Sequence, residues 1–143
     1  MQVADIMTRS VVSVDVDETL ERIHAIFEES KFHHVIVTDN GRIVGVVSDR
    51  DLLRHMSPFV GRRLMEREQD TRTFLRKAHQ MMTRRPVTVR ADMSIPEAVG
   101  VLLKHRVSCL PVAGVDRRVQ GILTWRDILS NCFPQEDRER DAA

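Results

Sequence analysis

A short polar pattern occurs twice in this chain, and its side chains are of the types that bind phosphate and sugar. The two copies are Gly45-Val46-Val47-Ser48-Asp49-Arg50-Asp51-Leu52-Leu53 and Gly121-Ile122-Leu123-Thr124-Trp125-Arg126-Asp127-Ile128-Leu129. Packing alone would repeat only the apolar positions. The return of a hydroxyl, an arginine and an aspartate at the same spacing therefore indicates a repeated chemical role.

Each copy stands where an apolar, strand-like run gives way to a helix. Free backbone N–H groups and the helix dipole at such a start favour an anion such as phosphate beside Ser48. Asp51 falls in the first helical turn, where its carboxylate could accept hydrogen bonds from both hydroxyls of a ribose. Arg50 could offer a guanidinium fork to phosphate oxygens. In the second copy the same roles fall to Thr124, Asp127 and Arg126.

The short apolar runs of each repeat offer surface and backbone edges for a planar base. The candidate contacts are Val12, Ser13 and Val46 in the first copy and Val87, Thr88 and Ile122 in the second. We predict no metal site at His33 and His34, because no second cluster of ligand residues accompanies them and adjacent strand residues point to opposite faces.

The same polar pattern is also typical of a helix cap. A Ser or Thr followed three residues later by an acid forms a capping box without any ligand. The acid is Asp in both copies, and its reach is shorter than that of the Glu that usually completes such a box, which favours the binding role. The sequence leaves both interpretations open.

The opening of the repeat returns as well. Met7-Thr8-Arg9-Ser10-Val11-Val12-Ser13-Val14 reappears as Met82-Thr83-Arg84-Arg85-Pro86-Val87-Thr88-Val89, an offset of 75 residues that becomes 76 after an insertion near 113–118. Each copy reads strand, helix, strand, strand, helix. We expect strands at 11–14, 35–37, 43–47, 87–89, 109–112 and 119–123, and closing helices at about 49–56 and 125–132. The longer helices should begin after Thr19 and Ser94, the latter in a capping box with Glu97.

The fold class is therefore α+β, a mixed α/β fold of two tandem β-α-β-β-α repeats packed about a pseudo-twofold axis. We expect the first repeat at 1–56, a connector at 57–77, the second repeat at 78–133 and a flexible tail at 134–143. The connector region from Arg62 to His79 has good helix formers and no internal Gly or Pro, which predicts an extra helix.

These features together resemble the CBS domain family, and the chain is similar to a stand-alone CBS pair, also called a Bateman module. The stretch Ser108-Cys109-Leu110-Pro111-Val112 keeps the Leu-Pro-Val part of a family pattern, and His33-His34-Val35-Ile36-Val37 occupies the same place in the first copy. The resemblance implies one cleft per repeat for an adenosine compound, and discs made of two pairs. It also implies that His33 contacts phosphate at the cleft rim, and the residues leave open the alternative of a structural histidine held by a partner.

Composition excludes several other classes. A net charge of +1 gives no electrostatic case for nucleic acid or a membrane surface. The longest apolar runs are about five residues, far below the roughly 20 that span a bilayer. The beginning of the chain shows no signal-peptide pattern, and the two cysteines form no disulfide framework, so we expect a cytoplasmic protein.

The leading hypothesis is a non-catalytic regulatory module that binds AMP, ADP or ATP, uses no catalytic cofactor, and signals to an unknown effector protein through conformation or dimer geometry. The alternatives are a structural or dimerisation adaptor with unoccupied clefts, an S-adenosylmethionine sensor and, third, an enzyme, for which no nucleophile with an adjacent base is visible. Apolar residues off the core stripes of the two long helices, Ile26, Val99 and Leu103, predict a homodimer.

Overall fold

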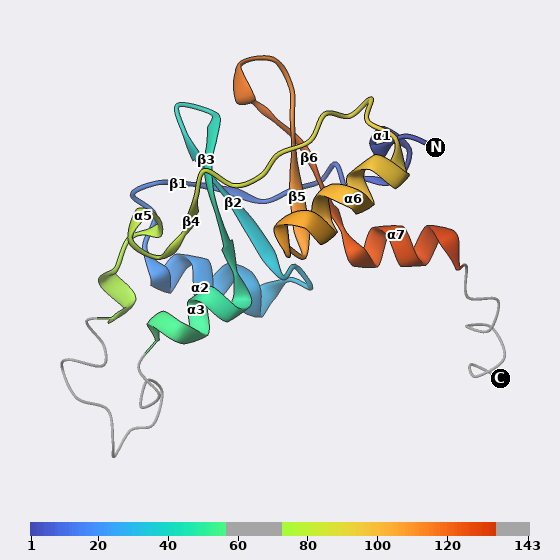
Figure 1. Ribbon diagram of the computed structural model, residues 1–143. Coiled ribbons are helices and arrows are strands. Elements are labelled where there is room, and N and C mark those ends of the chain that lie inside the picture. The colour runs from blue at the N-terminus through green and yellow to red at the C-terminus, as the bar shows by residue number, and fades with distance from the viewer. Residues whose placement is uncertain (57–72, 134–143) are drawn as a thin grey trace, which may run out of the picture. The chain divides into compact units, whose positions relative to one another are not determined.

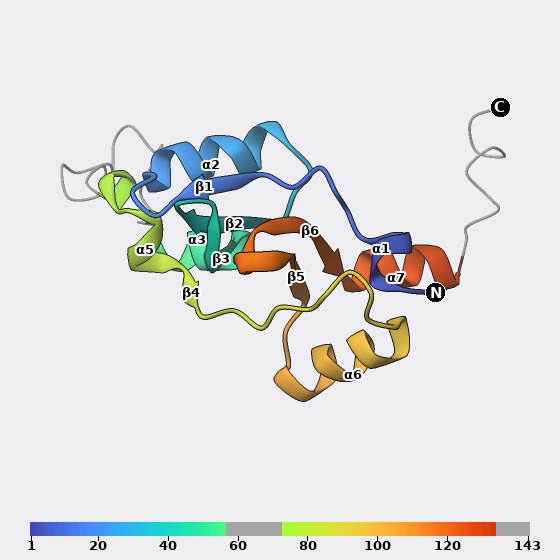
Figure 2. The same cartoon turned by 90° about the horizontal axis from the view of Figure 1, so that it is seen from above.

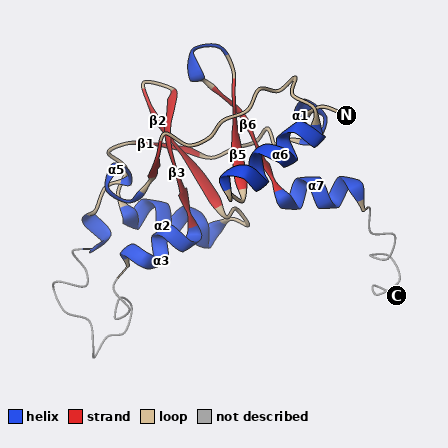
Figure 3. Cartoon of the chain, in the orientation of Figure 1, coloured by secondary structure: helices blue, strands red, loops and turns tan. Residues whose placement is uncertain are grey.

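The computed structural model describes residues 1–56 and 73–133, which form two compact units of mixed helix and strand (Figures 1 and 3). The first-repeat unit is the continuous segment Val11–Pro86. The second-repeat unit joins Met1–Ser10 to the described residues from Val87 onward. The predicted α+β class and the tandem repeat are confirmed.

The first-repeat unit is built on a four-stranded sheet in the order β1-β2-β3-β4. Strand β1 is parallel to β2, and the other pairs are antiparallel. The β2–β3 hairpin turns at Asn40 and Gly41, both with positive φ, as a two-residue type I′ turn requires. The strands are β1 (Ser13–Asp15), β2 (His34–Asp39), β3 (Arg42–Ser48) and β4 (Thr83–Arg84).

Helices α2 (Leu20–Glu29) and α3 (Asp49–His55) complete the core of this unit. Thr19 begins α2 as its N-cap, as predicted, and accepts a hydrogen bond from the Arg22 backbone N–H. The predicted core stripe is confirmed, since Leu20 and Ile23 are fully buried and Phe27 packs against them. Ile26, expected on the outer side of the helix, is half-buried and also packs against this core.

The second-repeat unit contains the antiparallel pair β5 (Cys109–Ala113) and β6 (Val119–Thr124), with a short 3₁₀ turn, η2 (Val115–Arg117), between them. Helices α6 (Ile95–His105) and α7 (Trp125–Cys132) flank the pair. The predicted capping box at the start of α6 is present between Ser94 and Glu97. The predicted apolar stripe of α6, Ile95, Ala98 and Leu102, is buried.

The strand expected at 87–89 is reduced to a single bridge, in which Val89 pairs in parallel with Val112. Its backbone hydrogen bonds run from Val89 N–H to Pro111 and from Ala113 N–H to Val89. In the first repeat the ladder continues one bond further, because the Ile36 N–H reaches the Val12 carbonyl at 3.2 Å. Pro111 stands at the place of Ile36 and has no N–H, so the second ladder ends there.

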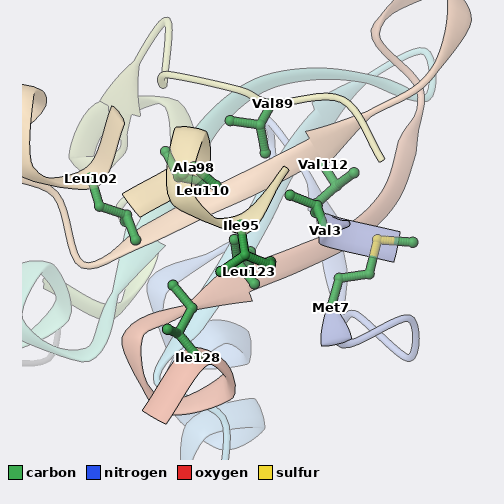
Figure 4. Packing of buried hydrophobic residues seen from close by; sticks show 10 residues of the cluster. All are labelled: Val3, Met7, Val89, Ile95, Ala98, Leu102, Leu110, Val112, Leu123 and Ile128. Carbon is green, nitrogen blue, oxygen red and sulfur yellow. The ribbon is translucent and has the colours of Figure 1, made fainter. Parts of the chain in front are cut away.

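The two units have exchanged their opening segments. Helix α1 (Val3–Ile6) belongs to the second-repeat unit, where it lies beside α7 (Figure 2). Val3 and Met7 are buried in the core of that unit, among residues of α6, β5, β6 and α7 (Figure 4). Burial of a valine side chain such as that of Val3 contributes about 1.5–3 kcal/mol to folding stability. The exchanged segment therefore helps to stabilise the second-repeat unit.

The equivalent segment of the second repeat, α5 (Ala78–Met81) followed by β4, packs in the first-repeat unit. The domain boundaries proposed from the sequence follow the repeats, whereas the compact units follow the exchange. Of the predicted connector, 57–72 lies outside the described residues, as does the tail from 134. At the described end of the connector, η1 (Thr73–Leu75) precedes α5, and the extended backbone of Lys77 interrupts the helix expected up to His79.

Candidate functional site

The first candidate site is the corner at which β3 turns into α3. Ser48 is the N-cap of α3, and its hydroxyl oxygen accepts a hydrogen bond from the Asp51 backbone N–H at 3.0 Å. Oδ2 of Asp51 accepts a reciprocal bond from the Ser48 N–H at 2.9 Å. Oδ1 of Asp51 takes no part in this cap. We call Ser48 to Asp51 the first corner.

The second corner, Thr124 to Asp127, repeats this geometry where β6 turns into α7. The Thr124 hydroxyl accepts from the Asp127 N–H at 3.3 Å, and Oδ2 of Asp127 accepts from the Thr124 N–H at 2.8 Å. The other carboxylate oxygen, Oδ1, accepts a bond from the Thr8 hydroxyl at 3.2 Å. The two corners thus differ in how many carboxylate oxygens are already engaged.

Both corners are complete capping boxes. The shorter reach of aspartate therefore does not favour binding over capping, because the extended backbone of each cap residue turns its own N–H toward the first helical turn, within reach of the carboxylate. Each aspartate therefore caps a helix, which does not prevent an oxygen outside the cap from accepting a further bond. The role of the aspartates in binding stays a prediction.

Arg50 and Arg126 are exposed at the second position of their helices. Within the described part of the chain, neither guanidinium forms a hydrogen bond or ion pair. The residue before each arginine differs between the copies. The first corner has Asp49 at this position, whereas the second has Trp125.

Ser13 and Val46 lie in one row of the first-repeat sheet, through Ile36 of β2. Val46 is only 6% exposed because β4 pairs with it at Thr83. In the second-repeat unit Ile122 is likewise 7% exposed, and Thr8 covers it through a backbone bridge. Val46 and Ile122 therefore offer the least surface of the predicted base contacts. Val12, Val87 and Thr88 are half-buried, and Ser13 is exposed.

Val12 and Ser13 also line a pocket of about 520 Å³. Its other walls come from β1 and from α2 with its flanking residues, including Arg22, Ile26 and Glu29, and it contains none of the residues of the first corner. This pocket therefore does not bring the predicted base contacts to Ser48 and Asp51.

Repeated glycines explain how the opening segments come so close to the two corners. A Cβ on Gly121 would lie 2.7 Å from the backbone oxygen of Thr8. A Cβ on Gly45 would collide with the side chain of Met82. The glycine that begins each polar pattern thus makes room for the segment that carries Thr8 or Thr83.

A histidine pair lies at the edge of the first corner. His33 Nδ1 is 3.0 Å from Oδ2 of Asp49, and the backbone N–H of Asp49 donates to the His33 carbonyl. Partial burial raises the pKa of Asp49, but the hydrogen bonds from His33 and the Arg50 backbone outweigh it and leave that pKa below its usual value. Burial lowers the pKa of His34, against the partly offsetting charges of Asp49 and Asp51.

Thr8 is the polar contact that the sequence interpretation missed. It belongs to the repeated opening Met-Thr-Arg, whose return as Thr83 was the available signal. What could not be read from the sequence is that each threonine serves the opposite repeat. In the described ranges, 1–56 and 73–133, no cluster of three metal-ligating side chains occurs, and no helix is long and apolar enough to cross a membrane.

Comparison with known proteins places this geometry in a family. A CBS domain-containing protein of Dictyostelium discoideum is 30% identical over 129 residues, which cover 89% of this chain and 88% of that protein. Arabinose 5-phosphate isomerase KpsF of Escherichia coli is 33% identical over 123 residues, and the match spans 85% of this chain but only 34% of KpsF. The crystal structure of CBSX2 in complex with AMP superposes with a TM-score of 0.74 at 28% identity, covering 92% of this chain and 95% of that one.

The family model described as CBS domain matches the chain twice, at residues 3–58 and 78–133. Both matches begin at an exchanged opening segment and run through a corner with its capping box. With both copies of the repeat matched, the chain belongs to the CBS domain family.

Proposed function

We propose that this protein is a non-catalytic regulatory module that binds AMP, ADP or ATP at the two corners. The observation that carries the proposal is the repeated corner itself, with a hydroxyl N-cap, an exposed arginine and an aspartate at the same positions. Support also comes from the relative CBSX2, a structure of which contains AMP. The isomerase activity of KpsF is not carried over, because the match covers 34% of that enzyme.

At each corner the ligand is held by three kinds of group. The ribose hydroxyls donate to the carboxylate oxygen of Asp51 or Asp127 that lies outside the cap. The phosphate lies at the start of the helix, where the dipole and the guanidinium of Arg50 or Arg126 favour an anion. We propose that the ligand binds one conformation of the module more tightly than another, so that occupancy shifts the conformation or the dimer geometry that an effector protein recognises.

Isothermal titration with AMP, ATP and S-adenosylmethionine tests the proposal, alongside thermal unfolding. At a ligand concentration a hundred times the dissociation constant, stabilisation should reach about 2.7 kcal/mol. The matched control is the double variant Asp51→Ala/Asp127→Ala, which should bind these compounds at least about thirtyfold more weakly while remaining folded. Tighter binding of S-adenosylmethionine than of either nucleotide would replace the nucleotide sensor with a sensor of that compound.

A second candidate function is a dimerisation adaptor without a ligand. It is favoured by one observation, namely that Asp127 already has both carboxylate oxygens engaged, by Thr124 and Thr8. If no adenosine compound binds at millimolar concentration and light scattering gives twice the chain mass, the adaptor is the better description.

A further inference from the structure

The first corner contains a fixed negative charge at a position where the second corner has none. The carboxylate of Asp49, which directly follows the cap residue Ser48, accepts hydrogen bonds from the His33 ring and from the Arg50 backbone N–H. Its Oδ2 lies 3.0 Å from Nδ1 of His33. These two bonds hold the carboxylate at the start of α3, the place that the proposed function gives to the phosphate.

The second corner has the same backbone arrangement at this point and a different side chain. The Trp125 N–H donates to the Ser108 carbonyl, as the Asp49 N–H donates to the carbonyl of His33. Trp125 is half-buried and packs against the core of the second-repeat unit. An indole therefore stands where the first repeat has a carboxylate, and a serine stands where the first repeat has the histidine that holds it.

A carboxylate close to a bound anion weakens the binding of that anion, because like charges repel. The phosphate of AMP brings about 1.5–2 negative charges at pH 7, whereas adenosine brings none. Asp49 therefore opposes only the phosphate part of a ligand, since the ribose and the base are uncharged. The Asp49 side chain is 46% exposed, so solvent and salt limit the effect to a modest factor.

The histidine bonded to Asp49 makes this charge depend on pH. Histidine side chains gain a proton in the range from pH 8 to pH 5, and a protonated His33 offsets the negative charge of Asp49. His34, the next residue, pairs with Ser48 across β2 and β3, and burial lowers its pKa below the ordinary value. The other charged groups beside this pair are Lys31 in the preceding loop and Arg50 and Asp51 on α3.

On the basis of the proposed function, we infer that the two corners are specialised by the charge of the ligand: Asp49 makes the first corner discriminate against phosphate, and His33 relaxes this discrimination on acidification. Asp49 is the specificity-determining residue, and His33 acts through it without contacting the ligand. The second corner, with Trp125 at this position, has neither property.

Adenosine and AMP are the matched probes, since they share the base and the ribose and differ only in the phosphate. Calorimetry on the full chain with Asp127→Ala reports the first corner, and calorimetry with Asp51→Ala reports the second. The affinity for AMP divided by the affinity for adenosine should be about three- to tenfold larger at the second corner than at the first.

Asp49→Asn tests the cause, because asparagine keeps the size of the side chain and a hydrogen-bond-accepting oxygen but removes the charge. Combined with Asp127→Ala, it should raise the affinity of the first corner for AMP by about three- to tenfold. The affinity for adenosine should stay within about twofold. A thermal melt checks that the variant folds.

The pH dependence tests the role of the histidine. Lowering the pH from 8 to 6 should narrow the difference between the corners by about two- to threefold. The phosphate itself also titrates near pH 6, but it does so at both corners, so the comparison between them cancels this change. His33→Gln should abolish the narrowing, and the matched variant His34→Gln should retain it. The opposite result for these two variants would overturn the role of His33.

The outcomes separate the inference from the proposed function. If both probes bind and the two corners show the same affinity ratio, or if Asp49→Asn leaves the ratio of the first corner unchanged, the inference is wrong and the proposed function stands. If neither aspartate variant silences a site, a two-site titration of the parent and of Asp49→Asn measures the same ratio and decides the inference. Failure of both adenosine and AMP to bind the parent chain removes the proposed function and the inference with it.

Discussion

The hydroxyl of Thr8 donates to Oδ1 of Asp127 across 119 residues of sequence. This contact joins the opening of the first repeat to the closing helix of the second. Thr83 pairs with Val46 as Thr8 pairs with Ile122, so its backbone has the corresponding place in the first-repeat unit. The structure shows no hydrogen bond between Thr83 and Asp51. The two corners thus share a backbone plan and differ in their side-chain bonds, the one from Thr8 among them.

Thr8→Val should raise the affinity of the second corner for AMP by about two- to fivefold, because it removes a donor that competes with ribose for Oδ1 of Asp127. The same change should lower the free energy of unfolding by about 0.5–1.5 kcal/mol, the usual contribution of one hydrogen bond. Calorimetry and urea unfolding measure the two effects. Thr83→Val is the control and should change neither quantity appreciably; equal effects of the two variants would contradict the assigned asymmetry.

Asp51→Ala and Asp127→Ala should each weaken AMP binding at their own corner by about thirtyfold to several hundredfold, from the loss of bonds worth about 2–4 kcal/mol. Because both carboxylates also cap helices, each variant should lose about 1 kcal/mol of stability. Ser48→Ala provides the control, since it removes the cap hydroxyl but keeps the Asp51 carboxylate. Its stability loss should be similar and its loss of affinity much smaller. Matching losses of affinity for Ser48→Ala and Asp51→Ala would mean that the carboxylate is only a cap.

Stability should fall on acidification through the histidine range because of His34. Burial lowers its folded-state pKa below the ordinary value of 6.5, so the unfolded chain binds more protons between the two values and unfolding becomes easier as the pH falls through that window. Of the charged groups nearby, Asp49 and Asp51 oppose the shift and His33 adds to it. Urea unfolding from pH 8 to pH 5 measures the effect, and His34→Gln should flatten this part of the profile. If the free energy of unfolding of His34→Gln depends on pH as steeply as that of the parent, another group is responsible for the effect.

Leu103→Glu should split the proposed homodimer into monomers and leave the fold intact, because the Leu103 side chain is 64% exposed on α6. Light scattering at micromolar concentration should give about twice the chain mass for the parent and a single chain for the variant. Ile26→Glu, which the sequence suggested as an equivalent test, should instead lower the melting temperature, since Ile26 packs against the core of its unit. A Leu103→Glu variant that remains dimeric would place the interface elsewhere, for example at the exposed Leu129 and Phe133 of the closing helix region.

Gly121→Ala should destabilise the protein by about 1–3 kcal/mol, because its Cβ would push against the backbone of Thr8 rather than against a side chain that can move. It should also weaken AMP binding at the second corner, since the opening segment is displaced. Gly100→Ala is the matched control: space around Gly100 is open, and alanine should stabilise α6 by up to about 1 kcal/mol. Thermal unfolding of both variants checks the contrast.

Much of the fold was predictable from the sequence, because the repeat fixes two copies of one element order and the apolar spacing fixes the core faces of α2 and α6. The capping residues Thr19, Ser94, Ser48 and Thr124 were predictable for the same local reason. The exchange of opening segments was not, since Met7-Thr8-Arg9 reads the same whichever repeat it packs against. That choice depends on tertiary contacts, such as Val3 in the core of the second-repeat unit.

The sequence already contained the reason why residues 87–89 form only a single bridge and not a strand. Val87 and Val89 have strand propensity, yet a proline in the neighbouring strand removes the donor that would extend the ladder. The partial burial of Ile26 could not be predicted from the sequence for a different reason. Helical spacing places it off the main stripe, but the apolar surface that α2 buries is wider than one stripe.

The exchange of opening segments also sets the order in which the chain can fold during synthesis. The first-repeat unit is one continuous segment and can form once Pro86 has left the ribosome. Val3 and Met7, made earlier, must wait for α6, β5, β6 and α7 before they are buried. The contacts of Val3 and Met7 join residues that lie far apart in the sequence, which raises the contact order. The packing of α1 into the second-repeat unit should therefore be a slow, late step of folding. Helix α1 is therefore made before the elements that bury it, and it should be among the last of the described elements to pack.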